Sequence, residues 1–478
     1  MPLLYALLAL LAAFLALITP RALRFVPPPR ESAKAEDIPA DAERLARHLQ
    51  AMLRLKTVSY PEEGRAEAAQ FAAFRDLLKT LYPLVHARCQ AELHGQNGLL
   101  YHLRGQVDGP PSVLMAHYDV VPADEGDWAH PPFAGMLVDG EVWGRGALDT
   151  KCTVLCLLEA LEAQLAAGFV PRNDLYLSLG GDEETLGQDA AAIVDALEAR
   201  GVRPAFVLDE GGAVVSRVFP GVTRAAALVG IAEKGSALVD LVAQGRPGHA
   251  SAPPFRQAAL TLAQAISRVA RRPLHFTLTA PAKALFDTLG RHSTFAYKLI
   301  FANLWCFAPL LDLICRRTGG ELDALVRTTV AFTRLHASPA YNVLPQQAKA
   351  GLNLRLISGD TAQDAVARLQ SVLKGLDVQV ELVRASQPSP ISPASGPAWQ
   401  RLARAIHATY PQAILSPYLM VAASDSRHFC RISDHVYRFS GFPLTRQQLS
   451  LIHSQNERIP VSLLPDGFRF FTRVIGQC

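Results

Sequence analysis

Short apolar runs alternate with helical patterns along the first half of the chain. Residues 113–116, 175–179 and 204–208 are apolar runs short enough to be buried strands. Residues 153–162 and 190–200, which lie between those runs, show the apolar spacing of helices. This alternation predicts an α/β fold, in which the carboxyl ends of strands gather along one edge of a sheet.

Residues that can bind a cation follow the end of each of these strands. His117 and Asp119 lie two positions apart, so an extended chain points both side chains to the same side. The full set is His117 and Asp119, Glu183 and Glu184, Asp209 and Glu210, with Asp149 at a fourth corner ahead of a helix. Taken singly, they have ordinary interpretations, such as a capping pair or a helix N-cap. Neighbouring carboxylates repel one another, however, and four such corners together predict a site for zinc or a similar divalent cation.

The middle of the chain has the pattern of a second, inserted domain. We expect strands at residues 237–242, 328–335, 347–356 and 378–383, and helices at residues 255–271 and 361–373. The order strand, helix, strand, strand, helix, strand is that of ferredoxin-like α+β domains. The predicted organisation is an N-terminal segment (1–25), a linker (26–40), a catalytic domain in two parts (41–228 and 389–478) and, between those parts, the inserted domain (229–388).

Two longer apolar runs do not fit the alternation. Residues 3–18 are apolar, and arginines follow but do not precede them, so an uncleaved single-pass membrane anchor is favoured over a cleaved signal peptide. The positive-inside rule would keep the rest of the chain in the cytoplasm, whereas cleavage would make it periplasmic or secreted, so the side of the membrane stays open. Residues 299–315, interrupted by Asn303 and Asp312, predict either a buried helix, which we favour, or an apolar surface helix that contacts a bilayer or an acyl chain.

Composition restricts the class of protein. Apolar residues make up 50% of the chain and charged residues 19%, as in globular proteins rather than disordered ones. The net charge of +4 and the lack of a Lys/Arg cluster give no reason to expect a nucleic-acid partner. The seven cysteines form no CxxC pair, which argues against structural zinc fingers and a disulfide framework.

Five sequence motifs resemble those of a known enzyme family. They are HYDVVP at 117–122, WGRGALDTK at 143–151, GDEETLG at 181–187, LDEGG at 208–212 and LIHSQNERI at 451–459. With them the chain resembles the di-zinc aminoacylase and carboxypeptidase metallopeptidases, from about residue 45 onwards. The closest resemblance is to the branch with vacuolar carboxypeptidase S and the N-fatty-acyl-amino-acid synthase/hydrolase. The resemblance implies a mixed-sheet zinc-peptidase catalytic domain, with the inserted domain serving as a lid and dimerisation domain.

The resemblance also implies a site for two zinc ions per chain, for which Co²⁺ or Mn²⁺ could substitute. In that arrangement Asp149 bridges the ions, His117 and Glu210 complete one site, and Glu184 and His453 complete the other. The choice of Glu210 over Asp209 depends on the register with the family motif. Glu183 would be the general base, and Asp119 would orient His117.

Four further residues match substrate-binding positions of the family. His249 matches a histidine that reaches the site of a partner subunit and stabilises the oxyanion. Asn342 and Arg355 match positions associated with substrate and carboxylate binding, and Arg427 is a weaker candidate for the carboxylate. From the residues alone, His249 would be a turn histidine, Asn342 a turn cap and Arg355 a solvated strand residue.

The sequence therefore predicts a membrane-anchored di-zinc hydrolase. It would cleave the amide bond of N-acyl amino acids or the C-terminal bond of short peptides, so its substrates are small molecules or short peptides. The apolar segments favour lipidic N-acyl amino acids slightly. The alternative is a catalytically silent family member that acts in binding or assembly. A homodimer through the inserted domain is a further expectation.

Overall fold

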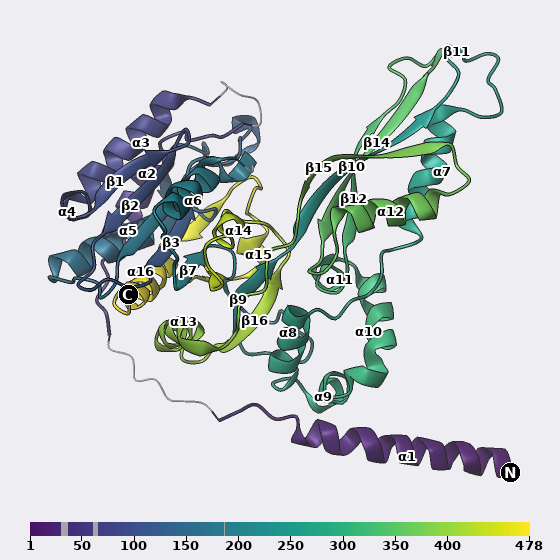
Figure 1. The fold of residues 1–478 in the computed structure, drawn as a ribbon, viewed down its shortest axis with the longest axis horizontal. Helices are drawn as coiled ribbons and strands as arrows, with labels where there is room; N and C mark the ends of the chain where they lie inside the picture. The colour runs from purple at the N-terminus through teal and green to yellow at the C-terminus, as the bar shows by residue number, and fades with distance from the viewer. Residues whose placement is uncertain (30–36, 61–65, 186) are drawn as a thin grey trace.

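A computed structural model describes residues 1–29, 37–60, 66–185 and 187–478. Much of the predicted linker at residues 26–40 lies outside these ranges. Figure 1 shows two lobes that are joined side by side, with an N-terminal helix that projects below them.

The larger sheet has ten strands and is mixed. Its order is β1 (Gln90–His94), β2 (Gly98–Leu103), β6 (Leu175–Gly180), β3 (Ser112–His117), β7 (Phe206–Asp209), β17 (Val436–Arg438), β9 (Ala226–Glu233), β8 (Val214–Val215) and β18 (Pro443–Leu444), with β16 (Ile414–Met420) paired to β9. At its centre, β3 runs parallel to both β6 and β7. The carboxyl ends of these three strands therefore lie at the same edge of the sheet.

Helices cover both faces of this sheet (Figure 1). One face carries α2 (Ala42–Leu53), α3 (Ala68–Leu81), α4 (Pro83–Arg88), α5 (Lys151–Ala166), α13 (Gly396–Thr409) and α16 (Leu464–Ile475), and the other carries α6 (Asp189–Ala199) and α14 (Ser426–Phe429). Alternate residues of each strand supply the two apolar layers: in β3, Leu114 and Ala116 pack into one, and Val113 and Met115 into the other. The predicted α/β class with a mixed sheet is confirmed.

A second sheet forms the other lobe. Its four antiparallel strands have the order β12 (Thr329–His336), β14 (Gln347–Leu356), β10 (Gly235–Gln244) and β15 (Val378–Ser386). Helices α7 (Ala258–Ala270) and α12 (Ala362–Leu373) share an apolar core with it. Along the chain these elements follow the strand and helix order that the sequence predicts. A short pair, β11 (Gly248–His249) and β13 (Val343–Leu344), forms the outer tip of this lobe.

Further helices lie between α7 and β12. They are α8 (Ala280–Gly290), α9 (Phe295–Phe301), α10 (Leu304–Thr318) and α11 (Gly320–Ala324), and α1 (Pro2–Arg24) packs its last turns against α9. The apolar run at 299–315 is not one helix, because α9 and α10 meet at an angle of 106°. Only Leu311 and Cys315 of α10 are buried. α10 is therefore a surface helix with one buried edge, not the buried helix that we favoured.

The last part of the chain returns to the larger sheet. Its β17 lies next to β7, and its β16 extends the sheet beside β9, so the yellow and blue segments of Figure 1 form one body. A small sheet of β4 (Met136–Val138), β5 (Glu141–Trp143) and β19 (Arg458–Pro460) also joins both segments. The short helix α15 (Arg446–Leu449) precedes the loop that carries His453.

Candidate metal centre

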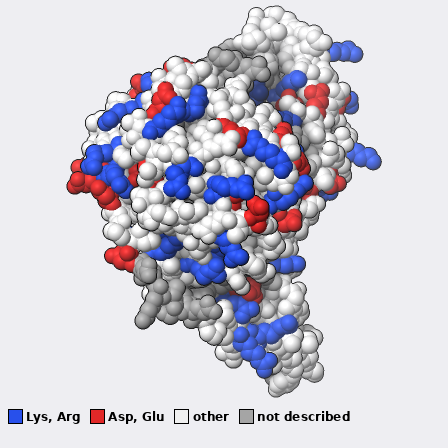
Figure 2. Space-filling view, turned by 60° about the vertical axis from the view of Figure 1, so that its left-hand side comes forward, with Lys and Arg blue, Asp and Glu red and all other residues white. Residues whose placement is uncertain are grey.

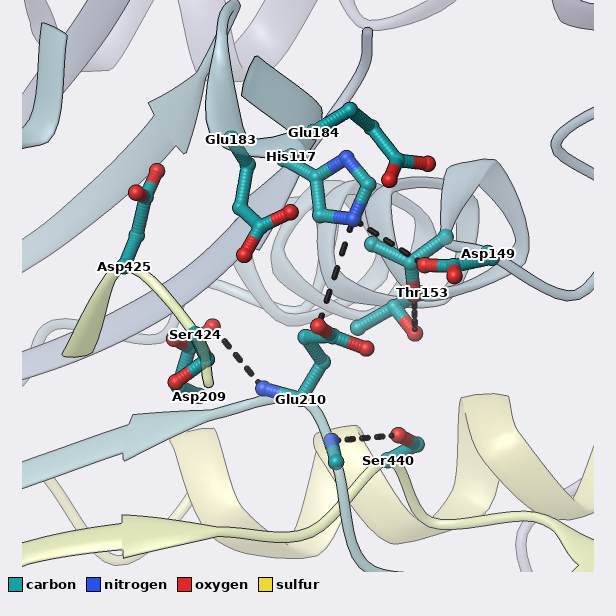
Figure 3. Close-up of polar contacts among 12 residues, drawn as sticks. His117, Asp149, Thr153, Glu183, Glu184, Asp209, Glu210, Ser424, Asp425 and Ser440 are labelled. Carbon is teal, nitrogen blue, oxygen red and sulfur yellow. Dashed lines mark hydrogen bonds and ion pairs between the residues drawn. The ribbon is translucent and has the colours of Figure 1, made fainter. Parts of the chain in front are cut away.

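The candidate site lies at the carboxyl edge of β3, β6 and β7 (Figure 3). His117 is the last residue of β3, and Asp149 stands just ahead of α5. The Nε2 atom of His117 lies 3.1 Å from Oδ1 of Asp149. The apolar run of β3 and the apolar helix α5 are packed into the core, so both side chains are fixed at its rim.

Asp119 joins three parts of the site. One of its oxygens lies 3.3 Å from Nδ1 of His117. The carboxylate also accepts the backbone N–H groups of Glu183, at 3.2 Å, and Glu184, at 3.1 Å. The Ser59 hydroxyl donates to it at 2.7 Å. Asp119 is fully buried and therefore holds the His117 ring and the two glutamates in a fixed relation.

His453 contacts both Glu184 and the second carboxylate oxygen of Asp149. Nε2 of His453 is 2.9 Å from Glu184 Oε2 and 3.1 Å from Asp149 Oδ2. Asp149 thus contacts one histidine with each of its two oxygens. This is the arrangement expected of a carboxylate that bridges two cations.

Of the two acidic residues at the end of β7, only Glu210 faces the cluster. Its Oε1 atom lies 4.0 Å from Nε2 of His117, as the dashed line in Figure 3 shows. Asp209 turns the other way, where its Oδ2 atom accepts the backbone N–H of Ser426 at 2.9 Å. The sequence motif alone left this choice to the register, and the backbone geometry favours Glu210.

Glu183 points into the site without contacting the other acidic side chains closely enough to share a proton. Figure 3 shows its carboxylate between His117, Glu210 and Asp425. Burial raises the pKa of Glu183 well above its usual value; His117 opposes this effect and Asp425 adds to it. Asp425, which sequence reasoning missed, is buried, and neither of its carboxylate oxygens has a hydrogen-bond partner among the described residues. A side chain at Gly180 would collide with it, since a Cβ there would lie 2.4 Å from Asp425 Oδ2.

Neighbouring carboxylates raise the pKa of both histidines. Hydrogen bonds to Asp149 and then Glu184 raise the pKa of His453 to about 10. Burial lowers the pKa of His117, but its contacts with Asp119 and Asp149 outweigh that effect and raise it well above the usual value. Burial likewise raises the pKa of Asp149, and hydrogen bonds from both histidines outweigh it and hold it below the usual range. A cation that takes these rings as ligands must displace their protons.

Glu457 organises the corner that carries Asp149, and sequence reasoning gave it no role. It is fully buried, and its carboxylate accepts the backbone N–H of Leu148 at 2.7 Å and that of Asp149 at 3.2 Å. Arg145 donates to its other oxygen at 2.7 Å. The only signal in the sequence was its place in the same motif as His453.

The residues present suit a pair of divalent cations. Ligand atoms of His117, Asp149 and Glu184 all lie within 4.8 Å of one another, and His453 and Glu210 extend the group on either side. The Oε1 atom of Glu184 is buried and has no hydrogen-bond partner among the described residues. A buried carboxylate oxygen without a partner costs free energy, which a cation would offset. Imidazole and carboxylate ligands match the preferences of zinc.

Two of the predicted substrate-binding residues lie far from this cluster. His249 belongs to β11, and the backbone carbonyl of Asn342 accepts the N–H of Ala250 at 3.0 Å, so both residues sit at the outer tip. Figure 1 places β11 at the end of the second lobe that is remote from β3 and β7. Within one chain the structure does not bring His249 and Asn342 to the acidic residues.

The two predicted arginines are closer to the cluster. Burial lowers the pKa of the Arg355 guanidinium in β14, and the nearby Glu183 carboxylate opposes this shift. Arg427 in α14 donates to the Ser424 carbonyl at 2.9 Å, and its Nη2 atom lies 4.0 Å from Asp425 Oδ1. Arg355 therefore interacts electrostatically with Glu183, and Arg427 approaches Asp425.

Comparisons of the sequence and of the fold with known proteins all lead to one family of metallopeptidases and its relatives. The family model described as peptidase family M20/M25/M40 matches residues 113–477. The N-fatty-acyl-amino acid synthase/hydrolase PM20D1 of Xenopus tropicalis is 35% identical over 451 residues, which cover 93% of this chain and 88% of that protein. The probable carboxypeptidase S-like 2 of Dictyostelium discoideum is 32% identical over 441 residues, covering 90% and 84%. The solved structure of the M20 family metallo-carboxypeptidase Sso-CP2 from Sulfolobus solfataricus has a similar fold, with a TM-score of 0.66 at 15% identity and coverage of 91% of this chain and 98% of that chain.

Proposed function

The chain belongs to peptidase family M20/M25/M40, and we propose that it is a two-metal hydrolase of amide bonds. The family, its branch and the enzyme class that the sequence predicted are confirmed by the matches to an N-fatty-acyl-amino acid synthase/hydrolase and a carboxypeptidase S-like protein. The alternative of a catalytically silent member is disfavoured, because all five ligand positions and the position of the base are filled.

The proposal rests above all on one observation. Potential ligand atoms of His117, Asp149 and Glu184, from distant parts of the chain, lie within 4.8 Å of one another, and His453 and Glu210 each contact this group. We infer that Asp149 bridges two zinc ions, with His117 and Glu210 at one and Glu184 and His453 at the other. When bound, the two cations would lower the pKa of a water held between them and polarise the scissile carbonyl. Co²⁺ or Mn²⁺ could take the same ligands.

Glu183 has the position and the environment of a general base. It adjoins the ligand Glu184 in the chain, yet its own carboxylate points at the open space of the site (Figure 3). Burial raises its pKa, which brings the carboxylate closer to the range in which it can both accept and return a proton. It would take a proton from the attacking water and deliver it to the leaving amine. Asp119 would keep the His117 ring in the tautomer that presents Nε2 to the metal.

The substrate class is proposed from the arginines and from the relatives. In an N-acyl amino acid, and at the last bond of a peptide, the leaving amine already carries a free α-carboxylate in the substrate. Arg355 or Arg427 could bind this group, because Arg355 interacts electrostatically with Glu183 and Arg427 approaches Asp425. A guanidinium is well suited to a carboxylate, which it can bind with two parallel hydrogen bonds.

His249 and Asn342 would serve the site of a second copy of the chain. They lie at the outer tip of the second lobe, away from the cluster of their own chain. A homodimer through this lobe would let the tip of each subunit reach the other subunit's centre. The lobe would then act as a lid and His249 as the group that stabilises the oxyanion.

The N-terminal helix would hold the enzyme at a membrane. Among the described residues, α1 is the one helix that is long and apolar enough to cross a bilayer by itself. Leu3, Leu7, Leu10 and most of their neighbours are exposed. We propose a single-pass anchor, and its side of the membrane follows from whether Arg21 and Arg24 stay in the cytoplasm.

The test compares the full chain in detergent with the Glu183→Gln variant. Both are loaded with zinc and assayed on N-acyl amino acids of graded chain length and on a panel of dipeptides. The turnover number of the variant should fall by about 10²–10⁴-fold, the usual contribution of a general base, while bound zinc stays the same. Glu43→Gln is the matched control, because this exposed side chain of α2 only approaches Arg47, at 3.7 Å.

Two outcomes would contradict the proposal. Unchanged turnover in Glu183→Gln would show that another group is the base. If the wild type binds no zinc, or binds zinc but cleaves none of these substrates, the binding or assembly role would be correct instead. Turnover of dipeptides alone would exclude the lipidic substrate class.

A further inference from the structure

One row of polar side chains crosses the second sheet at Arg355. Arg355 in β14 lies directly opposite Thr329 in β12 and Ser236 in β10, and Ser236 lies opposite Ser386 in β15. Residues directly opposite each other in antiparallel strands point to the same face of the sheet, with their Cβ atoms about 4.5–5.5 Å apart. The row therefore sets one guanidinium between two hydroxyl groups, with a third hydroxyl one strand further away.

This row lies on the face of the second sheet that α7 and α12 leave open. In β14, Leu354 is fully buried in the core that the sheet shares with these helices, whereas the next residue, Arg355, is only partly buried. In β12, Val330 packs against the same core, so Thr329 points to the other face. The Arg355 guanidinium also interacts electrostatically with Glu183. The open face at this row is therefore close to the candidate metal centre.

The guanidinium of Arg355 has donors to spare. It forms no hydrogen bond and no ion pair with the described residues. Arg427, the other candidate for the carboxylate, already donates to the Ser424 carbonyl at 2.9 Å and lies 4.0 Å from Asp425. A guanidinium that is partly removed from water without a partner costs free energy, which a bound anion would offset.

The two hydroxyl groups beside Arg355 are available as well. Those of Thr329 and Ser236 form no hydrogen bond within the part of the chain that the structure describes. The neighbouring Thr328 differs, because its hydroxyl donates to Asp360 and accepts the backbone N–H of Ile357. Each hydroxyl can donate one hydrogen bond, and a guanidinium can donate several in one plane. The row thus has the donors that a carboxylate needs.

The charges near the row also favour an anion. Nζ of the buried Lys234 donates to the carbonyls of Ala324 at 3.0 Å and Arg327 at 2.8 Å. Burial lowers the pKa of Lys234 to about 7; Asp323 opposes this shift and Arg355 adds to it. On the surface that Figure 2 shows, basic and acidic side chains are interspersed. The row itself contains a cation and no acidic residue, so a bound carboxylate would supply the missing negative charge.

We propose that Thr329 and Ser236 form, together with Arg355, the binding site for the free α-carboxylate of the leaving amino acid. The guanidinium binds the carboxylate, and one hydroxyl donates to it from each neighbouring strand. This proposal rests on the proposed function, in which the substrate carries such a carboxylate. It selects Arg355 over Arg427 and adds two specificity-determining residues. The substrate would then bridge the two lobes, with its carboxylate on the second sheet and its scissile bond at the metal centre.

The test measures KM and kcat of the full, zinc-loaded chain in detergent for an N-acyl amino acid. Ser236→Ala and Thr329→Val should each raise KM about tenfold or more, as loss of a hydrogen bond to a charged group does, and change kcat by less than about twofold. Thr329→Ser, which restores a hydroxyl, should recover most of the affinity. Ser386→Ala is the matched control, because it makes the same change in the same row but one strand further from Arg355. Its KM should equal that of the wild type.

Calorimetric binding of the same N-acyl amino acid to zinc-loaded Glu183→Gln gives a second measurement that needs no turnover. Adding Ser236→Ala or Thr329→Val should weaken this binding by the same factor as KM rises. Unchanged KM in both variants, an equal rise in Ser386→Ala, or a fall in kcat alone would overturn the carboxylate site and leave the proposed hydrolase in place. Binding that depends on both hydroxyls in a chain without hydrolysis would support the site and overturn the proposed function. Neither binding nor hydrolysis would overturn both.

Discussion

Replacing Glu457 with glutamine should loosen the corner that carries Asp149. The two oxygens of Glu457 accept four hydrogen bonds, from the Arg145 guanidinium and from the backbone N–H groups of Gly146, Leu148 and Asp149. Glutamine keeps the size of the side chain but offers only one oxygen. Its NH₂ group would face two donors, so two buried donors lose their acceptor.

The cost can be estimated from these lost contacts. A buried polar group without a partner costs about 1–3 kcal/mol. The Arg145 side chain, 4% exposed, would also lose its counter-charge, and breaking such a buried pair costs about 3–5 kcal/mol. All the lost contacts belong to the corner before α5, so weaker metal binding should be the main effect. A residue that supports a metal ligand typically contributes about 10–100-fold to affinity, and the dissociation constant for zinc should rise by that factor.

The assay is a zinc titration of the full chain in competition with a chelator, together with kcat/KM at saturating zinc. Glu141→Gln is the matched control, because Glu141 pairs with Arg458 at 2.7 Å but both side chains are partly exposed. An exposed pair of this kind contributes about 0–1 kcal/mol. Unchanged zinc affinity in Glu457→Gln, in protein that melts as the wild type does, would refute the argument.

Three further results are expected. Removing the metal with EDTA should lower the melting temperature, since a ligand at 100 times its Kd stabilises a fold by about 2.7 kcal/mol; equal melting curves would argue against a structural effect of the metal. In the metal-free protein the pKa of His453 is raised to about 10. The protonated ring therefore stabilises the fold fully below its ordinary pKa of about 6.5, and this stabilisation is lost as the pH rises through 10. The free energies of unfolding in urea of the metal-free wild type and of metal-free His453→Asn should therefore differ near pH 6 and converge above pH 10. Arg355→Met should raise KM about tenfold or more with little change in kcat, as loss of a charge-assisted hydrogen bond would do, and Arg427→Met tests the other candidate; unchanged KM in both would exclude them from carboxylate binding.

Local sequence patterns were sufficient to predict some elements of the fold. β14 was predicted with the bounds that the structure has, because apolar and polar residues alternate along it and one face is buried. The turn of the β4–β5 hairpin is equally local: Asp139 and Gly140 have the positive φ values that a tight turn requires. These features depend on neighbouring residues only, so they can be recognised in one sequence.

Other features depend on residues that are distant in the chain. Asp425 acts on Glu183 through its charge, and Glu457 holds Asp149 through a hydrogen bond; no periodicity in the sequence reports such relations. The break between α9 and α10 at Asn303 was missed because the amide is satisfied by α1, from the other end of the sequence. The elements of the last 90 residues were left unassigned, since short strands such as β17 are specified by the sheet they join.

In the proposed homodimer, the distance between the outer tip and the acidic cluster would allow two inactive variants to complement each other. A subunit with His249→Ala keeps an intact cluster, and a subunit with His117→Ala keeps an intact tip. Each would be inactive as a homodimer. In a mixed dimer, one centre would regain both parts, so coexpression of two dead variants should restore activity by complementation.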